Sequence, residues 1–160
     1  MRKAVLLNLL LLFTSLFSSG QALDTCLMRT YGGPGNEFAY GLAVMPDSGF
    51  IIGGVTNYYG QGGNSIYAVR TDKNGVHRWS KVLGGSQIDQ CKSVVATGDS
   101  GIYFTGFTNS YGLGGYDGVI IKTDTSGTEI WAKTYGGSDW DFFNSSISLA
   151  DGSIIACGNT

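Results

Sequence analysis

The sequence Tyr31-Gly32-Gly33 returns as Leu83-Gly84-Gly85 and again as Tyr135-Gly136-Gly137, each time 52 residues further along the chain. The register between these copies holds without a gap, because Trp79 and Trp131 are separated by the same 52 residues. A fixed period of about 50 residues is typical of proteins built from repeated supersecondary units. We therefore interpret this chain as a repeat protein.

Each repeat unit reads as short strands joined by turns. Apolar and β-branched runs alternate with clusters of Gly, Asp and Asn, and no window after the N-terminal segment carries uninterrupted helical spacing. The expected strands are 38–45, 50–56, 66–71 and 76–82; then 91–97, 102–108, 119–123 and 128–134; and finally 144–149 and 154–159. We predict an all-β fold in which each complete unit is a four-stranded antiparallel meander.

A meander repeated every 52 residues matches one blade of a β-propeller. We predict a partial β-propeller at 23–160, with blade one at 31–82, blade two at 83–134 and a partial blade three at 135–160. A β-solenoid is the alternative, although its repeats are usually shorter. Propellers close with about four to eight blades, whereas this chain supplies about 2.7. We expect one chain to form an incomplete ring. Either the chain is a fragment and the missing blades complete the ring, or several copies complete it by self-association.

Gly- and Asp-rich stretches between the expected strands are interpreted as turns. In Pro46-Asp47-Ser48-Gly49, we expect Pro to set φ, Asp to accept a backbone hydrogen bond and Gly to take a positive φ. Asp72–Gly75 and Asp124–Gly127 lack the alternating carboxylates and distal Glu of a calcium loop, which favours turn chemistry over a metal site. Gly60–Gly63 and Gly112–Gly115 open no helix, so we expect loops with positive φ in place of phosphate cradles.

The N-terminus has the pattern of an export signal. Arg2 and Lys3 supply positive charge, residues 4–17 are apolar, and 20–22 form a small-x-small cleavage site. We predict a signal peptide at 1–22 and a secreted or cell-surface protein, with an uncleaved anchor as the alternative. The apolar stretch is shorter than the roughly 20 residues that span a bilayer, and we expect no integral membrane segment in the mature chain.

Composition narrows the class of partner. Charged residues make up 14% of the chain, the formal net charge is -2 and the isoelectric point is about 5.1. Such a chain offers no basic stripe for a phosphate backbone, so we expect no nucleic-acid partner.

Three cysteines follow the predicted signal peptide: Cys26, Cys91 and Cys157. In an oxidising compartment one pair can join, and the sequence does not say which. Their repeat-equivalent positions hold other residue types, so we interpret Cys91 and Cys157 as small buried apolar residues. A lipid-modified Cys26 is a further alternative, disfavoured by the neighbouring Asp24 and Thr25.

Residues 121–137, Ile-Lys-Thr-Asp-Thr-Ser-Gly-Thr-Glu-Ile-Trp-Ala-Lys-Thr-Tyr-Gly-Gly, resemble the bacterial secreted β-propeller repeats of the SBBP type. That resemblance covers the chain after the signal peptide and implies tandem blades on exported proteins, largely with no assigned activity. Asp124, Gly127 and Trp131 also resemble, more distantly, the tryptophan-docking motif of quinoprotein propellers. Three residues are too few to predict a quinone, and we expect no cofactor. The two repeated tryptophans, Trp79 and Trp131, are expected to cover the neighbouring blade.

Catalytic groups do not form a recognisable set. His77 lies on an expected strand with no ligand-spaced Cys or carboxylate, and Glu129 replaces it in the next unit, which favours a solvated face. Asp139 and Asp141 are paired carboxylates of the kind that glycosidases use, but the sequence does not set their separation. We predict no catalytic residue and no enzyme.

If strands alternate in direction, the long loops within and between blades emerge together on one face. The ligand-binding residues that we predict on this face are Tyr58, Tyr59, Tyr111, Tyr116, Asp117 and Trp140. Aromatic rings mixed with amides and carboxylates suit a carbohydrate or protein ligand. Rings that only pack the loops are the alternative interpretation.

These patterns predict an exported, non-catalytic propeller segment that acts as a binding or display scaffold. The alternative is a portion of a glycan-active or quinone-dependent propeller enzyme whose catalytic residues lie outside this chain. A purely structural spacer is a third hypothesis.

Overall fold

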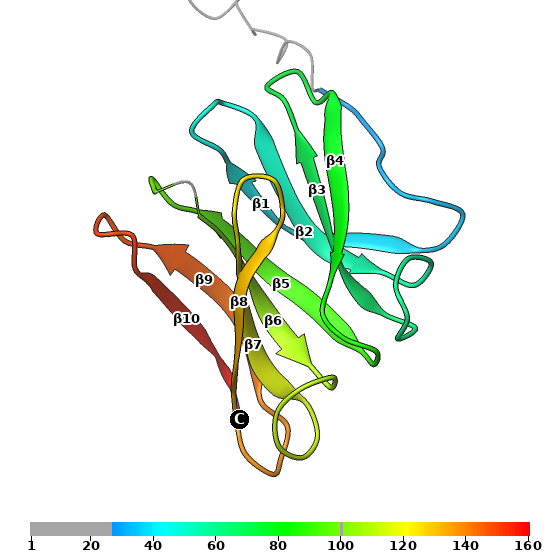
Figure 1. Ribbon diagram of the computed structural model, residues 1–160, viewed down its shortest axis with the longest axis vertical. Helices are drawn as coiled ribbons and strands as arrows, with labels where there is room; N and C mark the ends of the chain where they lie inside the picture. Colours follow the sequence, from blue (N-terminus) through cyan, green and yellow to red (C-terminus); the bar gives the residue numbers. More distant parts are fainter. Residues whose placement is uncertain (1–26, 100) are drawn as a thin grey trace, which may run out of the picture.

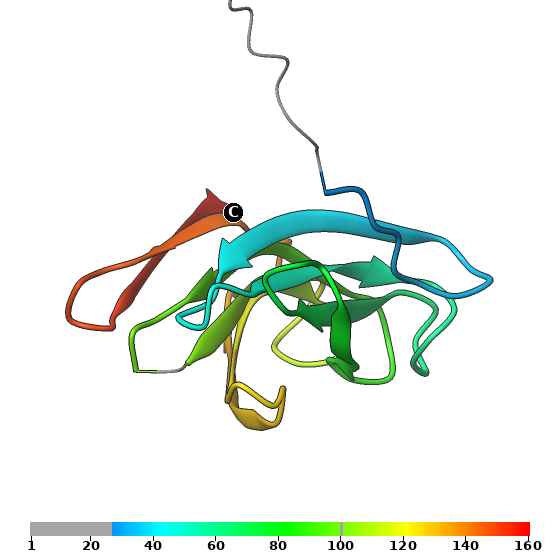
Figure 2. The same cartoon turned by 90° about the horizontal axis from the view of Figure 1, so that it is seen from above.

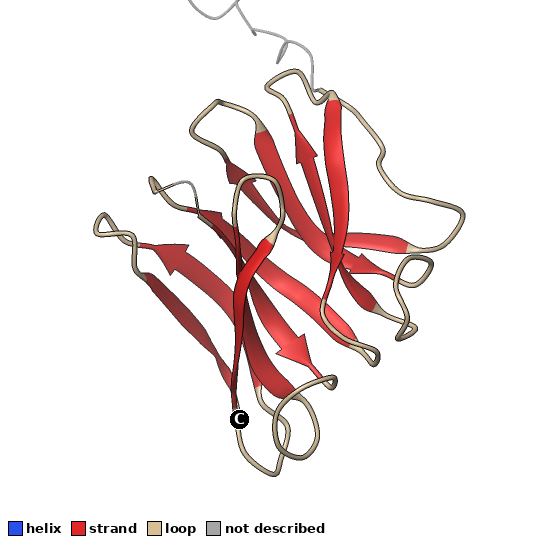
Figure 3. Cartoon of the chain, in the orientation of Figure 1, coloured by secondary structure: helices blue, strands red, loops and turns tan. Residues whose placement is uncertain are grey.

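The structure is a computed structural model that describes residues 27–99 and 101–160. The predicted signal peptide at 1–22 and Cys26 lie outside the described residues. Over the described ranges the chain forms ten strands and no helix (Figure 3), as the strand pattern predicts. The described residues form no helix that is long and apolar enough to cross a membrane.

The strands form three antiparallel sheets that follow chain order (Figure 1). The first sheet is β1 (Glu37–Val44), β2 (Phe50–Thr56), β3 (Ser65–Thr71) and β4 (His77–Leu83); the second is β5 (Asp89–Ala96), β6 (Ile102–Thr108), β7 (Asp117–Thr123) and β8 (Glu129–Tyr135); the third is β9 (Phe142–Ser148) and β10 (Ile154–Asn159). Both complete units are therefore four-stranded meanders, which confirms the prediction.

Sheet register repeats along with the sequence. In the first strand of each unit one residue is skipped in the pairing, at Tyr40, Lys92 and Asn144, which lie 52 residues apart. Such a bulge bends and twists the strand locally. Positions 52 residues apart therefore occupy the same place in successive sheets, and they can be compared directly.

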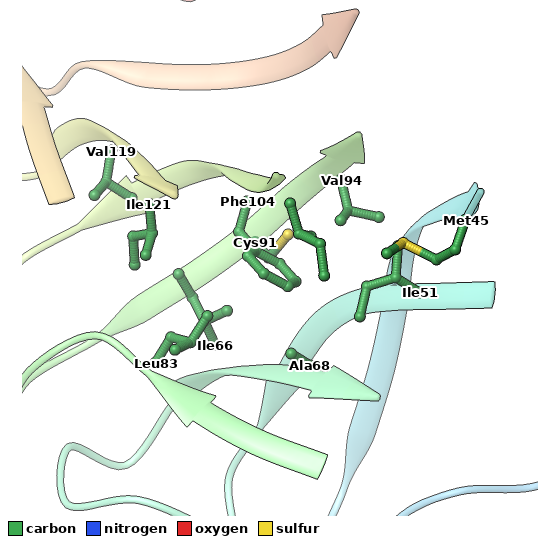
Figure 4. Close-up of a cluster of buried hydrophobic side chains, with 11 residues drawn as sticks. Met45, Ile51, Ile66, Ala68, Leu83, Cys91, Val94, Phe104, Val119 and Ile121 are labelled. Carbon is green, nitrogen blue, oxygen red and sulfur yellow. The ribbon is translucent and has the colours of Figure 1, made fainter. Parts of the chain in front are cut away.

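The hydrophobic core lies between the first and second sheets (Figure 4). It contains Met45, Ile51, Ile66, Ala68 and Leu83 from the first sheet and Cys91, Val94, Ile102, Phe104, Val119 and Ile121 from the second. The second sheet also contacts the third, through β5, β6 and β7 against β9. Each fully buried Ile or Phe contributes roughly 1.5–3 kcal/mol, so packing of sheet against sheet supplies the main apolar stabilisation. Figure 2 shows the three sheets following one another across the molecule.

Gly53 on β2 permits the close approach of the first two sheets. A Cβ at this position would lie 2.8 Å from Cys91 Sγ and 3.3 Å from a ring carbon of Phe104. These two side chains of the second sheet therefore fill the space that the missing side chain leaves.

The expected turn chemistry is confirmed with one correction. Asp47 Oδ1 accepts a hydrogen bond of 3.0 Å from the N–H of Gly49, and Asp72 and Asp124 accept backbone N–H groups in the same way. The prediction of a positive φ at Gly49 is wrong, because Ser48 takes it, with a φ of 66°. Gly49 is needed for another reason: a Cβ there would overlap the Arg70 guanidinium.

Candidate functional site

The longer connections meet on one surface, which we name the loop face. It consists of residues 32–36, 57–64, 84–88, 109–116 and 136–141. Backbone hydrogen bonds join consecutive connections: Asn109 N–H donates to the Ile88 carbonyl at 2.8 Å, and Asp141 N–H donates to the Tyr116 carbonyl at 2.7 Å. The tight turns lie at the opposite ends of the strands (Figure 1). The predicted gathering of long loops is therefore confirmed.

One carboxylate per unit holds the Gly-Gly motif in place on this face. The N–H of Gly33 donates to Glu37 at 3.1 Å, that of Gly85 to Asp89 at 2.8 Å, and that of Gly137 to Asp141 at 2.9 Å. The three acids are 52 residues apart. The repeated motif is thus Gly-Gly followed four residues later by an acid, and its role is to shape the loop between sheets.

Threonine hydroxyls complete this arrangement. Thr56 Oγ1 donates to Glu37 Oε1 at 2.9 Å, and Thr108 Oγ1 donates to Asp89. The hydroxyl of Thr160 lowers the pKa of the Asp141 carboxyl, with the Gly137 N–H as the second cause. A general acid needs a raised pKa, so the environment of Asp141 favours a structural anion. Asp139 is exposed beside it.

Tyrosine rings cover the Gly-Gly motifs of the first two units. A Cβ on Gly33 would lie 2.6 Å from the hydroxyl of Tyr59, and one on Gly85 would lie 3.0 Å from that of Tyr111. Tyr59 is half-buried, and burial raises the pKa of its hydroxyl. Tyr111 keeps an exposed ring, although partial burial raises its pKa as well. Both predicted residues therefore help to pack the loops.

A first aromatic cluster surrounds Tyr59. Its ring stacks on Tyr67 of β3 with centroids 5.5 Å apart and an interplanar angle of 17°. Tyr58 meets Tyr59 edge-on at 5.0 Å and stays exposed. Sequence reasoning did not include Tyr67, which lies within a strand and not in a loop.

A second cluster contains Trp140, which meets Tyr116 edge-on at 5.3 Å. Phe107 and Phe142 complete it from β6 and β9. Trp140 is 61% exposed, so much of its ring faces solvent while the rest packs against the other rings of the cluster. Phe142 was not among the predicted residues, although its place beside the Trp140 loop could have suggested it.

Asp117 is oriented into the protein. It is 2% exposed, and its carboxylate accepts the Leu113 N–H at 3.0 Å, which holds the 109–116 loop. Of the six predicted residues, the structure exposes Tyr58, Tyr111 and Trp140, half-buries Tyr59 and Tyr116, and buries Asp117. The exposed members are the ones placed to touch a ligand.

A hollow of about 490 Å³ adjoins the first cluster. Its lining comes from Thr30, Tyr31, Gly32, Tyr59, Tyr67, His77, Ser80, Lys81 and Val82. His77 is exposed as predicted, and its Nε2 lies 2.8 Å from Ser80 Oγ. Tyr31 was missed, although Thr30-Tyr31 matches Thr134-Tyr135 in the repeat. The tyrosine rings of this lining can stack on a ring-shaped ligand, and Lys81 and Ser80 can bond its polar groups.

The two cysteines among the described residues, Cys91 and Cys157, differ in exposure. Cys91 is fully buried, and burial raises the pKa of its thiol to about 12. The expectation of burial is wrong for Cys157, which is exposed; among the described strands, β10 packs only against its pairing partner β9. Among residues 27–99 and 101–160, no group of three or more His, Cys, Asp or Glu side chains is placed to hold a metal.

Comparison with protein-family models and with curated proteins finds no match for this chain. The SBBP-type resemblance thus stays a prediction that rests on residues 121–137.

Proposed function

We propose that this chain is a segment of an exported β-propeller, with about 2.7 blades, that acts as a non-catalytic binding scaffold at or outside the cell surface. The stacking of two repeated meanders around a shared core supports the propeller. The signal-like pattern of residues 1–22 and the SBBP-type motifs support export.

One observation carries the choice of binding over catalysis. The three repeated acids of the loop face accept hydrogen bonds from neighbouring Gly N–H groups, while aromatic rings remain exposed beside them. Carboxylates held in this way use their oxygen atoms to accept the hydrogen bonds that shape the loops. Exposed Tyr58, Tyr111 and Trp140 offer flat apolar surfaces with a polar edge, which suit recognition.

A carbohydrate is the ligand class that this surface fits best. The apolar C–H face of a sugar ring can stack on Trp140 or enter the hollow beside Tyr59 and Tyr67, and Lys81 and Ser80 can bond its hydroxyl groups. A peptide with aromatic or acidic side chains would use the same groups, and the experiment distinguishes the two.

The test is to probe glycan and peptide arrays with the purified chain and to titrate any hit by tyrosine and tryptophan fluorescence. Trp140→Ala and Tyr67→Ala are each expected to weaken binding at least tenfold if their cluster holds the ligand. Val76→Ala is the matched control, because Val76 is an exposed apolar residue in the β3–β4 turn.

Three outcomes would contradict the proposal. Hydrolytic turnover lost in Asp139→Ala or Asp141→Ala would favour a glycan-active enzyme. Absorbance from a bound quinone would favour a cofactor-dependent one. If no glycan or peptide binds or shifts the melting temperature, the structural-spacer hypothesis would be favoured.

A further inference from the structure

The first sheet has an open face on the side away from the second sheet. We name it the N-face; it includes Ala39, Leu42 and Ile52, and it is hollowed by about 260 Å³. Leu42 occupies the position that Val94 has in the second sheet, 52 residues later. Leu42 is 65% exposed, whereas Val94 is 4% exposed inside the core. The N-face therefore holds the repeat equivalents of a core surface, and no sheet of the described residues packs on it.

The third sheet has the opposite open face, which we name the C-face. It presents Ile147, Leu149, Ile155 and Cys157, which are the repeat equivalents of Ala43, Met45, Ile51 and Gly53. Ile51 is fully buried in the core, but Ile155 is 52% exposed. Strands β9 and β10 carry no charged residue that would keep this face in water.

Side-chain sizes at the two open faces can be compared with those at the contact between the first and second sheets. Between the first and second sheets, Gly53 faces the larger Cys91 and Phe104. At the equivalent positions of a C-face on an N-face, the larger Cys157 would meet the smaller pair Ala39 and Ile52.

The combined side-chain volume of Cys157, Ala39 and Ile52 is therefore close to that of Gly53, Cys91 and Phe104 in the existing core, as close packing requires. Between the second and third sheets the equivalent positions hold Thr105, Phe143 and Ala156, so Phe104 is replaced by a smaller residue while Gly53 and Cys91 are replaced by larger ones.

A second observation concerns the chain just before β1, beside the N-face. Residues 29–33, Arg-Thr-Tyr-Gly-Gly, match Lys-Thr-Tyr-Gly-Gly at 133–137, where the outermost strand β8 ends. Residues 29–31 belong to no strand, yet Arg29 and Tyr31 line the N-face hollow. The chain thus carries an outer-strand sequence beside the surface that a neighbouring sheet would cover.

We propose that the C-face of one chain packs on the N-face of a second copy, head to tail, as the second sheet packs on the first. The contact is heterologous, so further copies can add until a ring closes. This proposal does not depend on the ligand of the loop face.

The test is sedimentation velocity of the purified chain over a range of concentrations, with Leu42→Asp and Ile155→Asp as the two variants. Both residues are exposed in the single chain, so the variants should keep the circular dichroism spectrum and urea midpoint of the parent. Leu113→Asp is the control, because Leu113 is 74% exposed on the loop face.

We expect the parent and the control to self-associate as concentration rises and each face variant alone to remain monomeric. A mixture of the two variants should form dimers and nothing larger, because only one intact N-face and one intact C-face remain in each pair. A monomeric parent, a mixture that stays monomeric, or association that one of the two variants leaves unchanged would overturn the proposal.

Cross-linking gives an independent readout that does not rely on an introduced charge. Ala39→Cys is expected to form an intermolecular disulfide with the exposed Cys157 when diamide is the oxidant, and peptide mapping identifies the pair. Leu113→Cys should form no such link with Cys157. Equal linkage from both positions would indicate random collision and would count against the proposal.

Discussion

The indole N–H of Trp79 donates a hydrogen bond of 3.1 Å to the carbonyl oxygen of Thr125 and so joins β4 to the β7–β8 turn of the next sheet. Its ring also lies against Gly127, where a Cβ would come within 2.8 Å of it. The expectation that this tryptophan covers the neighbouring unit is confirmed. Trp131, its repeat equivalent, meets Tyr103 of its own sheet edge-on at 5.9 Å.

Trp79→Phe should lower the free energy of unfolding by about 1 kcal/mol, because it keeps a ring but removes the hydrogen bond between sheets. Trp131→Phe is the matched control and should cost less, since its ring contact is within one sheet. Urea denaturation followed by circular dichroism measures both. Equal losses would show that the bond to Thr125 does not stabilise the packing of the sheets.

Strand positions were predictable because each strand and turn is specified by neighbours in sequence. The Asp47, Asp72 and Asp124 side chains bond backbone groups two residues away, so their roles follow from local chemistry. The repeat strengthens the prediction, because a strand or turn assigned in one unit must also suit the equivalent residues of the next unit.

Properties that depend on contacts between distant residues were less predictable. Gly49 owes its place to Arg70, and Asp117 is buried beneath a loop that its own carboxylate holds. The exposure of Cys157 depends on which sheets surround β10. The sequence indicated correctly that the long loops share a face, but it could not show which of their side chains point outward.

Asp89 is the buried member of the repeated acids and should be the most costly to remove. Its carboxylate accepts the Gly85 N–H and the Ser110 hydroxyl, each at 2.8 Å, and also the Thr108 hydroxyl. Asp89→Ala leaves three donors unpaired and should lower the free energy of unfolding by about 3 kcal/mol or more.

The matched variant is Glu37→Ala, for which we expect about 1 kcal/mol, because water can reach the half-buried site of Glu37. Chemical denaturation of both variants checks the ranking. A fully stable Asp89→Ala protein would mean that this carboxylate is free for another role.

Acid should weaken the β5–β6 turn at Asp99. The Thr97 hydroxyl, the Gly101 N–H and the Lys122 ammonium together lower the pKa of Asp99 from 3.8 to about 2. Because the folded carboxyl binds protons less tightly than the unfolded one, it contributes stability above about pH 4 that is lost as the pH falls toward 2.

Asp99→Ala should therefore be less stable than the parent at neutral pH, with a difference that shrinks as the pH falls from 4 to 2. Thermal melts across this pH range measure it, and Asp139→Ala serves as an exposed carboxylate control. A difference that does not change with pH would show that ionisation of Asp99 does not contribute.

The two described cysteines should differ in reactivity because only one thiol is accessible. Cys157 is exposed in the single chain and should react with iodoacetamide in native protein that is dilute enough to be monomeric, whereas Cys91 is buried with its thiol pKa raised to about 12 and should react only after denaturant is added. Mass spectrometry of the tryptic peptides assigns each site. Because Cys91 lies between the first and second sheets, its alkylation in the native state would mean that these sheets separate readily, which contradicts a shared core.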